Sequence, residues 1–187
     1  MVTLRVALSS VMLQSMREVE QLAILESQDS TPESICACVA DIFHVEETEV
    51  ALLELSGSLL NFVYPAELKT AGAIPLSSLA VAARTARGKQ AELFNSFTQV
   101  KHFSIFELVK LGRTGLDAQV IQKLMSVPVF ARGGEVVGVI QVCRKAPRPA
   151  AAGPDFTPDD LNKLESVALM VGRIMGKGRS LAQASSG

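Results

Sequence analysis

The sequence predicts an α+β domain organised around a β-hairpin at the centre of a sheet. Two observations lead to this prediction. Residues 124–144 consist of two valine-rich runs separated by Gly133-Gly134, and valine favours the pleated surface of a strand. Segments with apolar residues at three- and four-residue steps lie before and after this stretch, which indicates helices. Because both faces of the hairpin are apolar, we expect other elements to cover both.

The turn of this hairpin predicts which residues lie opposite one another. A two-residue turn at Gly133-Gly134 needs positive φ at both positions, which glycine allows. The pairs that follow are Ser126 with Gln141, Pro128 with Val139, and Phe130 with Val137. Alternation then gives one face a mixed set of side chains: Leu124, Ser126, Pro128, Phe130, Val137, Val139, Gln141 and Cys143. Proline cannot donate to a ladder, so we expect a local irregularity at Pro128, while Gly138 lets a helix approach the other face.

Two helices are predicted before the first strand. Residues 9–26 carry an apolar stripe wider than one contact needs, which fits a helix lying on the sheet or one that also contacts a partner chain. Thr31 and Pro32 then provide the N-cap and first position of a second helix that extends to about His44. Cys36 and Cys38 point to different faces of this helix and are interpreted as small buried residues.

Short strands and one helix are predicted between the second helix and the hairpin. Ser77 and Ser78 can cap this helix, and Gly88 ends it. The predicted elements are strands over 49–55 and 59–64, an extended piece over 73–76, a helix over 79–87 and a strand over 90–95. Residues 96–121 are less regular, with helices expected over 102–111 and 117–122, and such long connections are often functional.

A final helix follows the hairpin. Thr157 and Pro158 give a strong start, with acidic residues in the first turn, and Gly176 and Gly178 are expected to stop the helix. The sequence therefore divides into an N-terminal helix over 1–30, a domain over 31–176 and a disordered tail over 177–187.

Composition and charge exclude several functions. The net charge of −1 offers no field for nucleic acid or an anionic membrane, and no run is long enough to span a bilayer. Three cysteines and the absence of a signal peptide indicate a cytoplasmic protein. No metal-binding or catalytic motif is present, so we expect no enzyme activity and no metal site. Arg84 and Arg87, one turn apart, fit a surface pair better than an anion site.

The order of elements and three local motifs resemble the GAF domain family. The motifs are Val127-Pro128-Val129 followed by Gly134 and Gly138-Val139-Ile140, Phe156-Thr157-Pro158-Asp159-Asp160-Leu161, and Ala83-Arg84-Thr85 to Gly88-Lys89-Gln90. The resemblance covers residues 31–175. It implies a GAF-like fold, of profilin-like or PAS-like type: an antiparallel sheet of five or six strands with helices on both faces. The first and last helices would share one face, and residues 91–121 would close a pocket over the other.

Specialised members of this family carry motifs that this sequence lacks. Near Asn95 and Phe97, the Lys and Asp-Glu pair of the cyclic-nucleotide-binding members are missing. His102 has no neighbouring cysteine for a bilin and fits a surface or hydrogen-bonded histidine better than a haem ligand, so the cofactor stays unknown. Some GAF-fold proteins reduce free methionine sulfoxide with pocket cysteines, but the cysteines here do not form such a pair.

The mixed face of the hairpin predicts a ligand pocket, because small-molecule sites are mostly apolar with a few placed polar groups. A filled core is the alternative, in which Gln141 bonds to the backbone and the aromatic residues pack together. The residues expected to line the pocket are Tyr64, Asn95, His102, Phe103, Phe106, Ser126, Phe130, Val139 and Gln141.

Together these features predict a cytoplasmic, bacterial sensory or regulatory protein that binds a small molecule. We expect a homodimer formed through the N- and C-terminal helices, since paired terminal helices can form a bundle across a two-fold axis. These residues contain no effector domain, so either the chain acts through an effector protein as a partner or the sequence is part of a longer protein. A ligand-free dimerisation or protein-interaction module is the alternative, and free methionine sulfoxide reduction is a third.

Overall fold

The structure is a computed structural model that describes residues 31–99 and 120–184. The helices of this part of the chain are α2 (Pro32–Phe43), α3 (Val81–Gly88) and α4 (Pro158–Ala184). The strands are β1 (Val50–Ser56), β2 (Leu59–Tyr64), β3 (Ile74–Pro75), β4 (Glu92–Phe94), β5 (Val120–Phe130) and β6 (Val136–Ala146). Short 3-10 turns lie at Glu47–Glu49, Ala66–Leu68, Phe97–Gln99 and Pro149–Ala151. The helices predicted over 9–26 and 102–111 lie outside the described residues.

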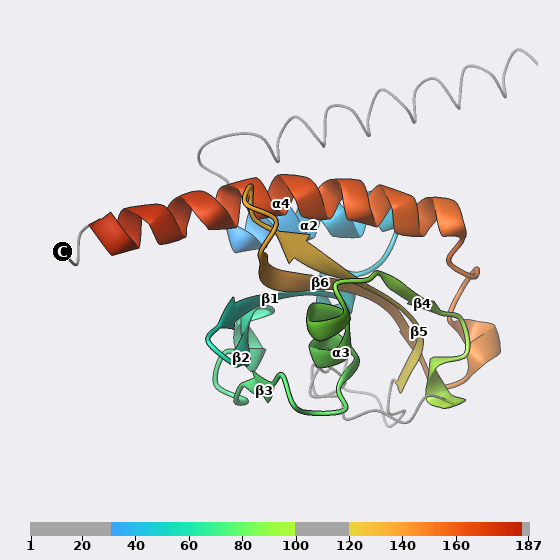
Figure 1. Ribbon diagram of the computed structural model, residues 1–187. Coiled ribbons are helices and arrows are strands. Elements are labelled where there is room, and N and C mark those ends of the chain that lie inside the picture. The colour runs from blue at the N-terminus through green and yellow to red at the C-terminus, as the bar shows by residue number, and fades with distance from the viewer. Residues whose placement is uncertain (1–30, 100–119, 185–187) are drawn as a thin grey trace, which may run out of the picture.

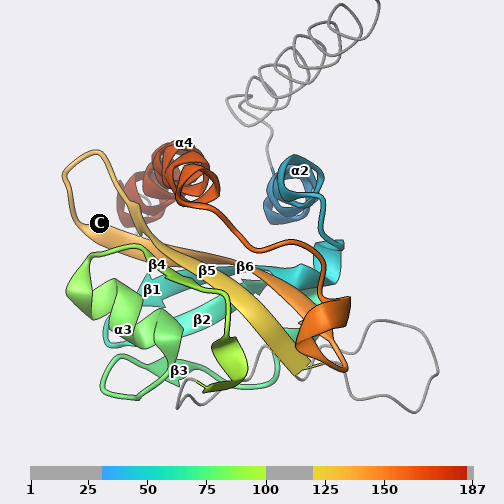
Figure 2. The same ribbon diagram turned by 90° about the vertical axis from the view of Figure 1, so that its right-hand side faces the viewer.

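The strands form one antiparallel sheet in the order β3-β2-β1-β6-β5-β4. Helices α2 and α4 lie side by side on one face of this sheet, and α3 lies on the opposite face (Figure 1, Figure 2). The predicted α+β fold with helices on both faces is therefore confirmed, and the sheet has six strands. The predicted hairpin, β5–β6, lies inside the sheet rather than at its edge.

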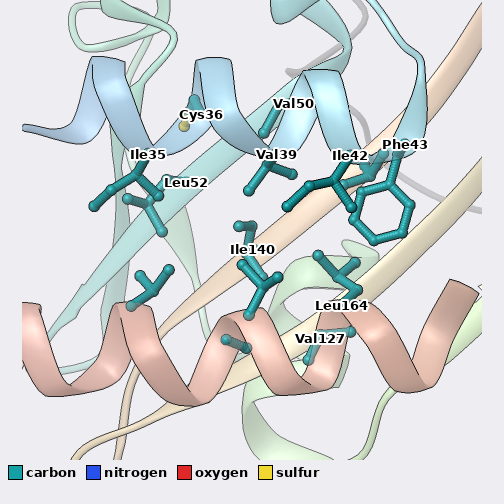
Figure 3. Close-up of a cluster of buried hydrophobic side chains, with 14 of the residues drawn as sticks. Ile35, Cys36, Val39, Ile42, Phe43, Val50, Leu52, Val127, Ile140 and Leu164 are labelled. Carbon is teal, nitrogen blue, oxygen red and sulfur yellow. The ribbon is translucent and has the colours of Figure 1, made fainter. Parts of the chain in front are cut away.

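Each face of the sheet carries its own hydrophobic core. Between the sheet and its two larger helices lies the α2–α4 core (Figure 3). It includes Ile35, Val39, Ile42, Phe43, Val50, Leu52, Val127, Ile140 and Leu164. The α3 core lies on the other face and includes Ala51, Leu53, Leu60, Phe62, Ala82, Ala86, Phe97, Leu124, Val139 and Cys143. A fully buried aliphatic or aromatic side chain contributes about 1.5–3 kcal/mol, so the two cores supply the main stabilising term.

The body of the hairpin has the predicted pairing. Ser126 lies opposite Gln141, and Pro128 lies opposite Val139. The position predicted for a strand irregularity, Pro128, is wrong. The pairing of β5 with β6 shifts between Val129 and Phe130 instead.

The turn of the hairpin differs from the prediction. Its loop consists of residues 132–134 and is closed by a hydrogen bond from the Ala131 amide to the Glu135 carbonyl at 2.9 Å. Gly134 alone has positive φ, at 84°, so the predicted two-residue turn is wrong. A three-residue loop of this kind ends in a left-handed residue that forms a bulge, and glycine adopts that conformation at low cost.

A second irregularity, further from the turn, changes which side chains share a face. The register shifts between the pairs Val129–Gly138 and Phe130–Val136, which leaves Val137 as an extra residue on β6 and places Phe130 opposite Val136. Val136 packs against the α3 core, whereas Val137 lies in the α2–α4 core. One extra residue in a strand with period two exchanges the two faces, so the predicted assignment of Val137 to the mixed face is wrong.

Helix α2 begins as predicted. The Thr31 hydroxyl accepts a hydrogen bond from the Ser34 amide at 3.2 Å, and the Ser34 hydroxyl oxygen accepts one from the Thr31 amide at 3.0 Å. Pro32 occupies the first turn, where its missing N–H has no helical partner to lose. The helix ends at His44, which adopts a left-handed conformation with φ of 52°.

Helix α3 begins two residues later than predicted. Its N-cap is Ala80, which makes no side-chain capping bond, although the Ser78 hydroxyl accepts from the Ala80 amide at 3.4 Å. At the other end, Lys89 rather than Gly88 has the left-handed conformation, with φ of 54°. The local composition therefore located this helix but misplaced both of its ends.

Two predicted boundaries near the last elements are wrong. Helix α4 continues through Gly176 and Gly178 to Ala184, so most of the predicted tail is helical, and residues 185–187 lie outside the described part. A glycine inside a helix costs about 1 kcal/mol relative to alanine, which packing elsewhere along the helix can offset. Residues 120–122, predicted as helix, belong to β5.

Candidate functional site

The candidate site lies on the face of the sheet that α3 covers. Ser126 of β5 and Gln141 of β6 pair directly across the hairpin, and both are buried on this otherwise apolar face. Strand β4 places Glu92 next to Ser126 on the other side. Helix α3 lies above this point and brings Thr85 down onto Ser126, with 2.8 Å between the two hydroxyl oxygens.

These four side chains form a hydrogen-bonded chain that ends on a carboxylate, and we call it the polar chain. Gln141 Nε2 donates to Ser126 Oγ at 3.0 Å, and Thr85 Oγ1 donates to Glu92 Oε2 at 3.0 Å. A hydroxyl has one proton, so if Thr85 donates to Glu92, the bond between the two hydroxyls must run from Ser126 to Thr85. The polar chain therefore has one direction, from Gln141 through Ser126 and Thr85 to Glu92.

Arg84 balances the charge at the end of the polar chain. Its Nε lies 2.7 Å from Glu92 Oε1, and its guanidinium carbon lies 5.5 Å from the centre of the Phe94 ring. The Arg84 side chain is 43% exposed and that of Glu92 is 22% exposed, so solvent screens this ion pair. Arg87 makes a separate contact, donating from Nη1 to the Ser78 carbonyl at 3.0 Å. The two arginines therefore have different partners and do not form a joint anion site.

Gln141 is the least satisfied member of the polar chain. Its side chain is buried, with the residue only 6% exposed. Among the residues that the structure describes, Ser126 is the one hydrogen-bond partner of its amide group. An amide group can donate two hydrogen bonds and accept two, so most of this capacity is unused by the described part of the chain.

The structure brings together three of the residues predicted to line a pocket. Ser126, Val139 and Gln141 lie on the α3 face, with Val139 in the α3 core. Phe130 lies beyond the bulge at the hairpin turn, where it is half-buried. His102, Phe103 and Phe106 lie outside the described residues, and so does most of the predicted cover.

Tyr64 lies on the opposite face from the one predicted. A register shift between Leu52 and Leu53 places Tyr64 opposite Leu52, in the α2–α4 core, although Phe62 lies in the α3 core. Its hydroxyl donates to Glu47 Oε2 at 3.2 Å. Burial raises the pKa of Tyr64, and the bond to Glu47 raises it further.

Asn95 also has a role other than lining the rim. Its Nδ2 donates to the Phe156 carbonyl at 2.9 Å, and its Oδ1 accepts from the Phe156 amide at 2.9 Å. The side chain is therefore used to hold the residue before the N-terminus of α4.

Thr85 and Glu92 are site residues that the sequence did not reveal. Thr85 belongs to a motif that carried the family resemblance, but nothing in its local sequence indicates a partner. Its contacts depend on where α3 lies above β4 and β5, which is a tertiary feature. A buried threonine on an alanine-rich helix is a weak signal of a polar contact, because such a hydroxyl needs a partner.

The cysteines lie in separate places. Cys36 and Cys38 belong to α2 and the α2–α4 core, whereas Cys143 lies in the α3 core on the other side of the sheet. Burial raises the pKa of Cys36 and of Cys38, so both thiols stay protonated near neutral pH. Within residues 31–99 and 120–184, no group of three or more histidine, cysteine or acidic side chains could hold a metal ion. No helix in the same residues is long and apolar enough to cross a membrane.

Comparisons with known proteins identify the family. The family model for the GAF domain matches residues 33–175. No protein of curated function matches the chain. Among solved structures, the GAF domain of the Acinetobacter phosphoenolpyruvate-protein phosphotransferase has a TM-score of 0.66 at 16% identity, over 90% of this chain and 95% of that one. The GAF domain of the corresponding Coxiella burnetii protein has a TM-score of 0.65 at 7% identity, over 90% and 98% of the two chains.

A free methionine sulfoxide reductase (fRMsr) of Staphylococcus aureus has a TM-score of 0.56 at 15% identity, over 87% of this chain and 94% of that one. At such identities these neighbours show the fold alone. The family match spans most of the chain and agrees with the six-stranded antiparallel sheet and its helices. The chain therefore belongs to the GAF domain family.

Proposed function

We propose that this chain is a regulatory GAF module that binds a small molecule on the α3 face of its sheet. The observation that carries the proposal is Gln141, a buried amide whose one side-chain partner in the described chain is Ser126. Its Oε1 makes no hydrogen bond in the described chain, yet the fully enclosed side-chain atoms without a partner there belong to Thr48, Gln122 and Arg144, so the Gln141 oxygen is still open to another molecule. A ligand is one way to match it.

The surroundings of Gln141 favour a neutral and largely apolar ligand. Val139 and Cys143 flank it on the same strand and lie in the α3 core. Glu92, the charged member of the polar chain, is already paired with Arg84, so within the polar chain no unpaired charge is available to hold an ion. An amide recognises a group that both donates and accepts, so the proposed ligand carries such a pair of atoms on an apolar body.

The first test replaces Gln141 with leucine. We expect Gln141→Leu to weaken ligand binding by roughly 5- to 30-fold, because the ligand's polar group would lose a hydrogen bond in a buried site. Native mass spectrometry of the purified protein would identify any small molecule that co-purifies, and titration with that molecule would then give both affinities.

Gln122→Leu is a matched control for this test. Gln122 is also buried on β5 and also makes one side-chain bond, from Nε2 to the Ala146 carbonyl at 2.9 Å, but its Oε1 is enclosed without a partner among the described residues, and it lies at the other end of the hairpin. The control should lose stability in a similar way while it keeps the ligand. Equal loss of binding in both variants, or no bound molecule in the wild-type protein, would contradict the proposal.

A ligand-free interaction module is the second candidate, and one observation favours it. The Ser126 and Thr85 hydroxyls both donate within the polar chain, so neither has a proton left for a ligand. In that case the polar chain would serve to fix α3 on the sheet.

A homodimer is part of the proposed function under either candidate, and an effector protein would receive its signal. The support comes from α4, which carries Leu169 with 55% of its surface exposed and extends beyond the sheet (Figure 1). We expect light scattering at micromolar concentration to give the mass of a dimer, and deletion of residues 1–27 to reduce it to a monomer. A monomer in the full chain would contradict the dimer, and an unchanged dimer after the deletion would contradict the role of the first helix.

We also expect no reductase activity, although two neighbours in fold are free methionine sulfoxide reductases. Reduction of a sulfoxide needs a nucleophilic thiolate and a resolving cysteine within reach. Cys36 and Cys143 lie on opposite faces of the sheet, and burial raises the pKa of Cys36. An assay of free methionine sulfoxide with a thiol reductant should give only background turnover. Turnover that disappears in Cys143→Ser would show that this expectation is wrong.

A further inference from the structure

Strand β4 is a short edge strand that contacts both layers of the protein. Glu92 accepts the last hydrogen bond of the polar chain, and Phe94 packs against the α3 core. Leu93, between them, packs against the α2–α4 core on the other face. A strand of three residues has few ladder bonds to hold it, so a change in the polar chain can displace it.

The residue after β4 connects this strand to the start of α4. Asn95 bonds twice to the main chain of Phe156, with both distances at 2.9 Å. Phe156 is followed by Thr157, whose hydroxyl accepts from the Asp160 amide at 3.1 Å and so caps α4. The Asn95 amide thus pairs with both main-chain groups of Phe156, as a residue of an adjacent strand would, and so fixes the position at which α4 begins.

Phe156 is also connected to the end of α2, through Arg144. The guanidinium carbon of Arg144 lies 4.8 Å from the centre of the Phe156 ring. The same guanidinium donates to the Phe43 carbonyl at 3.2 Å and to the His44 carbonyl at 3.3 Å. It therefore satisfies carbonyl groups at the C-terminus of α2, where a positive charge is favourable.

We propose that Asn95 and Phe156 form a coupling contact between the two faces of the sheet. A displacement of β4, caused by a change in the polar chain, passes through Asn95 to Phe156 and so to the first turn of α4. Through Arg144 it also reaches the last turn of α2. The proposed ligand would be the stimulus, and in that respect the inference rests on the proposed function. The contact itself can be tested without a ligand.

The test uses amide hydrogen exchange of the full chain, measured by mass spectrometry. Thr85→Val keeps the shape of the side chain but removes the hydroxyl that links Ser126 to Glu92. We expect this variant to raise the exchange rate over residues 161–165 about fivefold, because the first turn of α4 opens more often. In an Asn95→Ala background, Thr85→Val should cause no further increase over the same residues.

Two controls separate coupling from general loss of stability. Thr85→Ser restores a hydroxyl and should return exchange in α4 close to the wild-type rate. Leu60→Val removes a methylene from the same α3 core in β2, far from β4 in the order of the sheet. If urea unfolding shows that Leu60→Val and Thr85→Val lose the same global stability, Leu60→Val should leave the amide exchange rate over residues 161–165 unchanged.

Either of two results would overturn the coupling. One is an α4 that exchanges at the wild-type rate in Thr85→Val while β4 exchanges faster. The other is an effect of Thr85→Val that is as large with Asn95→Ala as without it. Neither result bears on ligand binding, which is measured separately with Gln141→Leu. Failure of the coupling can therefore be distinguished from failure of the proposed function.

Discussion

Replacing Gly172 with alanine should destabilise the fold by about 2–3 kcal/mol, a large effect for adding one methyl group. Gly172 lies in α4 where the helix rests directly on the main chain of β5. A Cβ atom at this position would overlap the Phe130 carbonyl oxygen and lie 2.8 Å from the Phe130 carbonyl carbon. Backbone atoms in a paired strand cannot move aside as a flexible side chain can, so the helix itself must shift.

The helix propensity of alanine works against this loss. Alanine is favoured over glycine inside a helix by about 1 kcal/mol, so the overlap must exceed that gain before any destabilisation is seen. Urea unfolding followed by circular dichroism gives the free energy of unfolding, and the slope with urea shows whether the extent of unfolding has changed.

Gly176→Ala is the matched control, one turn further along the same helix. A Cβ at Gly176 would lie 3.6 Å from the Cβ of Ala131, which is ordinary van der Waals contact. With the propensity gain and no overlap, this variant should be as stable as the wild type or up to about 1 kcal/mol more stable. Similar free energies for the two variants would mean that α4 can slide on the sheet and that the close approach at Gly172 is not required.

The sequence predicted those parts of the fold that local chemistry determines. The start of α4 at Thr157-Pro158 and the start of α2 at Thr31-Pro32 follow from capping, which involves only neighbouring residues. The pairing of Ser126 with Gln141 follows from the alternation of the hairpin. These features need no knowledge of the rest of the molecule.

The two errors in assigning side chains to a face of the sheet share one physical cause. Gly133-Gly134 is compatible with a two-residue turn and with a three-residue loop, whose registers differ by one residue. With the three-residue loop, one extra residue, Val137, restores the predicted pairing of Ser126 with Gln141, and this bulge moves Val137 to the other face. The register shift opposite Leu52 did the same to Tyr64. Bulges are set by how strands fit the whole sheet, so local sequence does not predict them well.

The candidate site was predicted in part for the same reason. Ser126 and Gln141 belong to one hairpin and could be paired from sequence, whereas Thr85 and Glu92 reach them from α3 and β4. Asn95 was expected at a pocket rim because it follows a strand, but its amide matches the main chain of Phe156, 61 residues away in sequence. Only the folded structure brings such residues together.

Phe156 is the residue at which several of these long-range contacts meet. It is 3% exposed and belongs to the α2–α4 core. Its main chain is bonded to Asn95, and its ring lies under the guanidinium of Arg144. The main-chain bonds do not depend on the side chain, whereas the packing and the cation–π contact do.

Truncating this side chain should therefore cost about 3–5 kcal/mol, as expected when a buried phenylalanine is replaced by alanine. Part of that cost is the contact with Arg144, which is worth about 1 kcal/mol or more when desolvated. Phe156→Leu fills most of the volume without a ring, so it should lose clearly less, and the difference reports the ring. Urea unfolding gives both values. Hydrogen exchange should also rise at the last turn of α2, since Arg144 caps it. A loss below about 1 kcal/mol for Phe156→Ala would show that α4 is held without this residue.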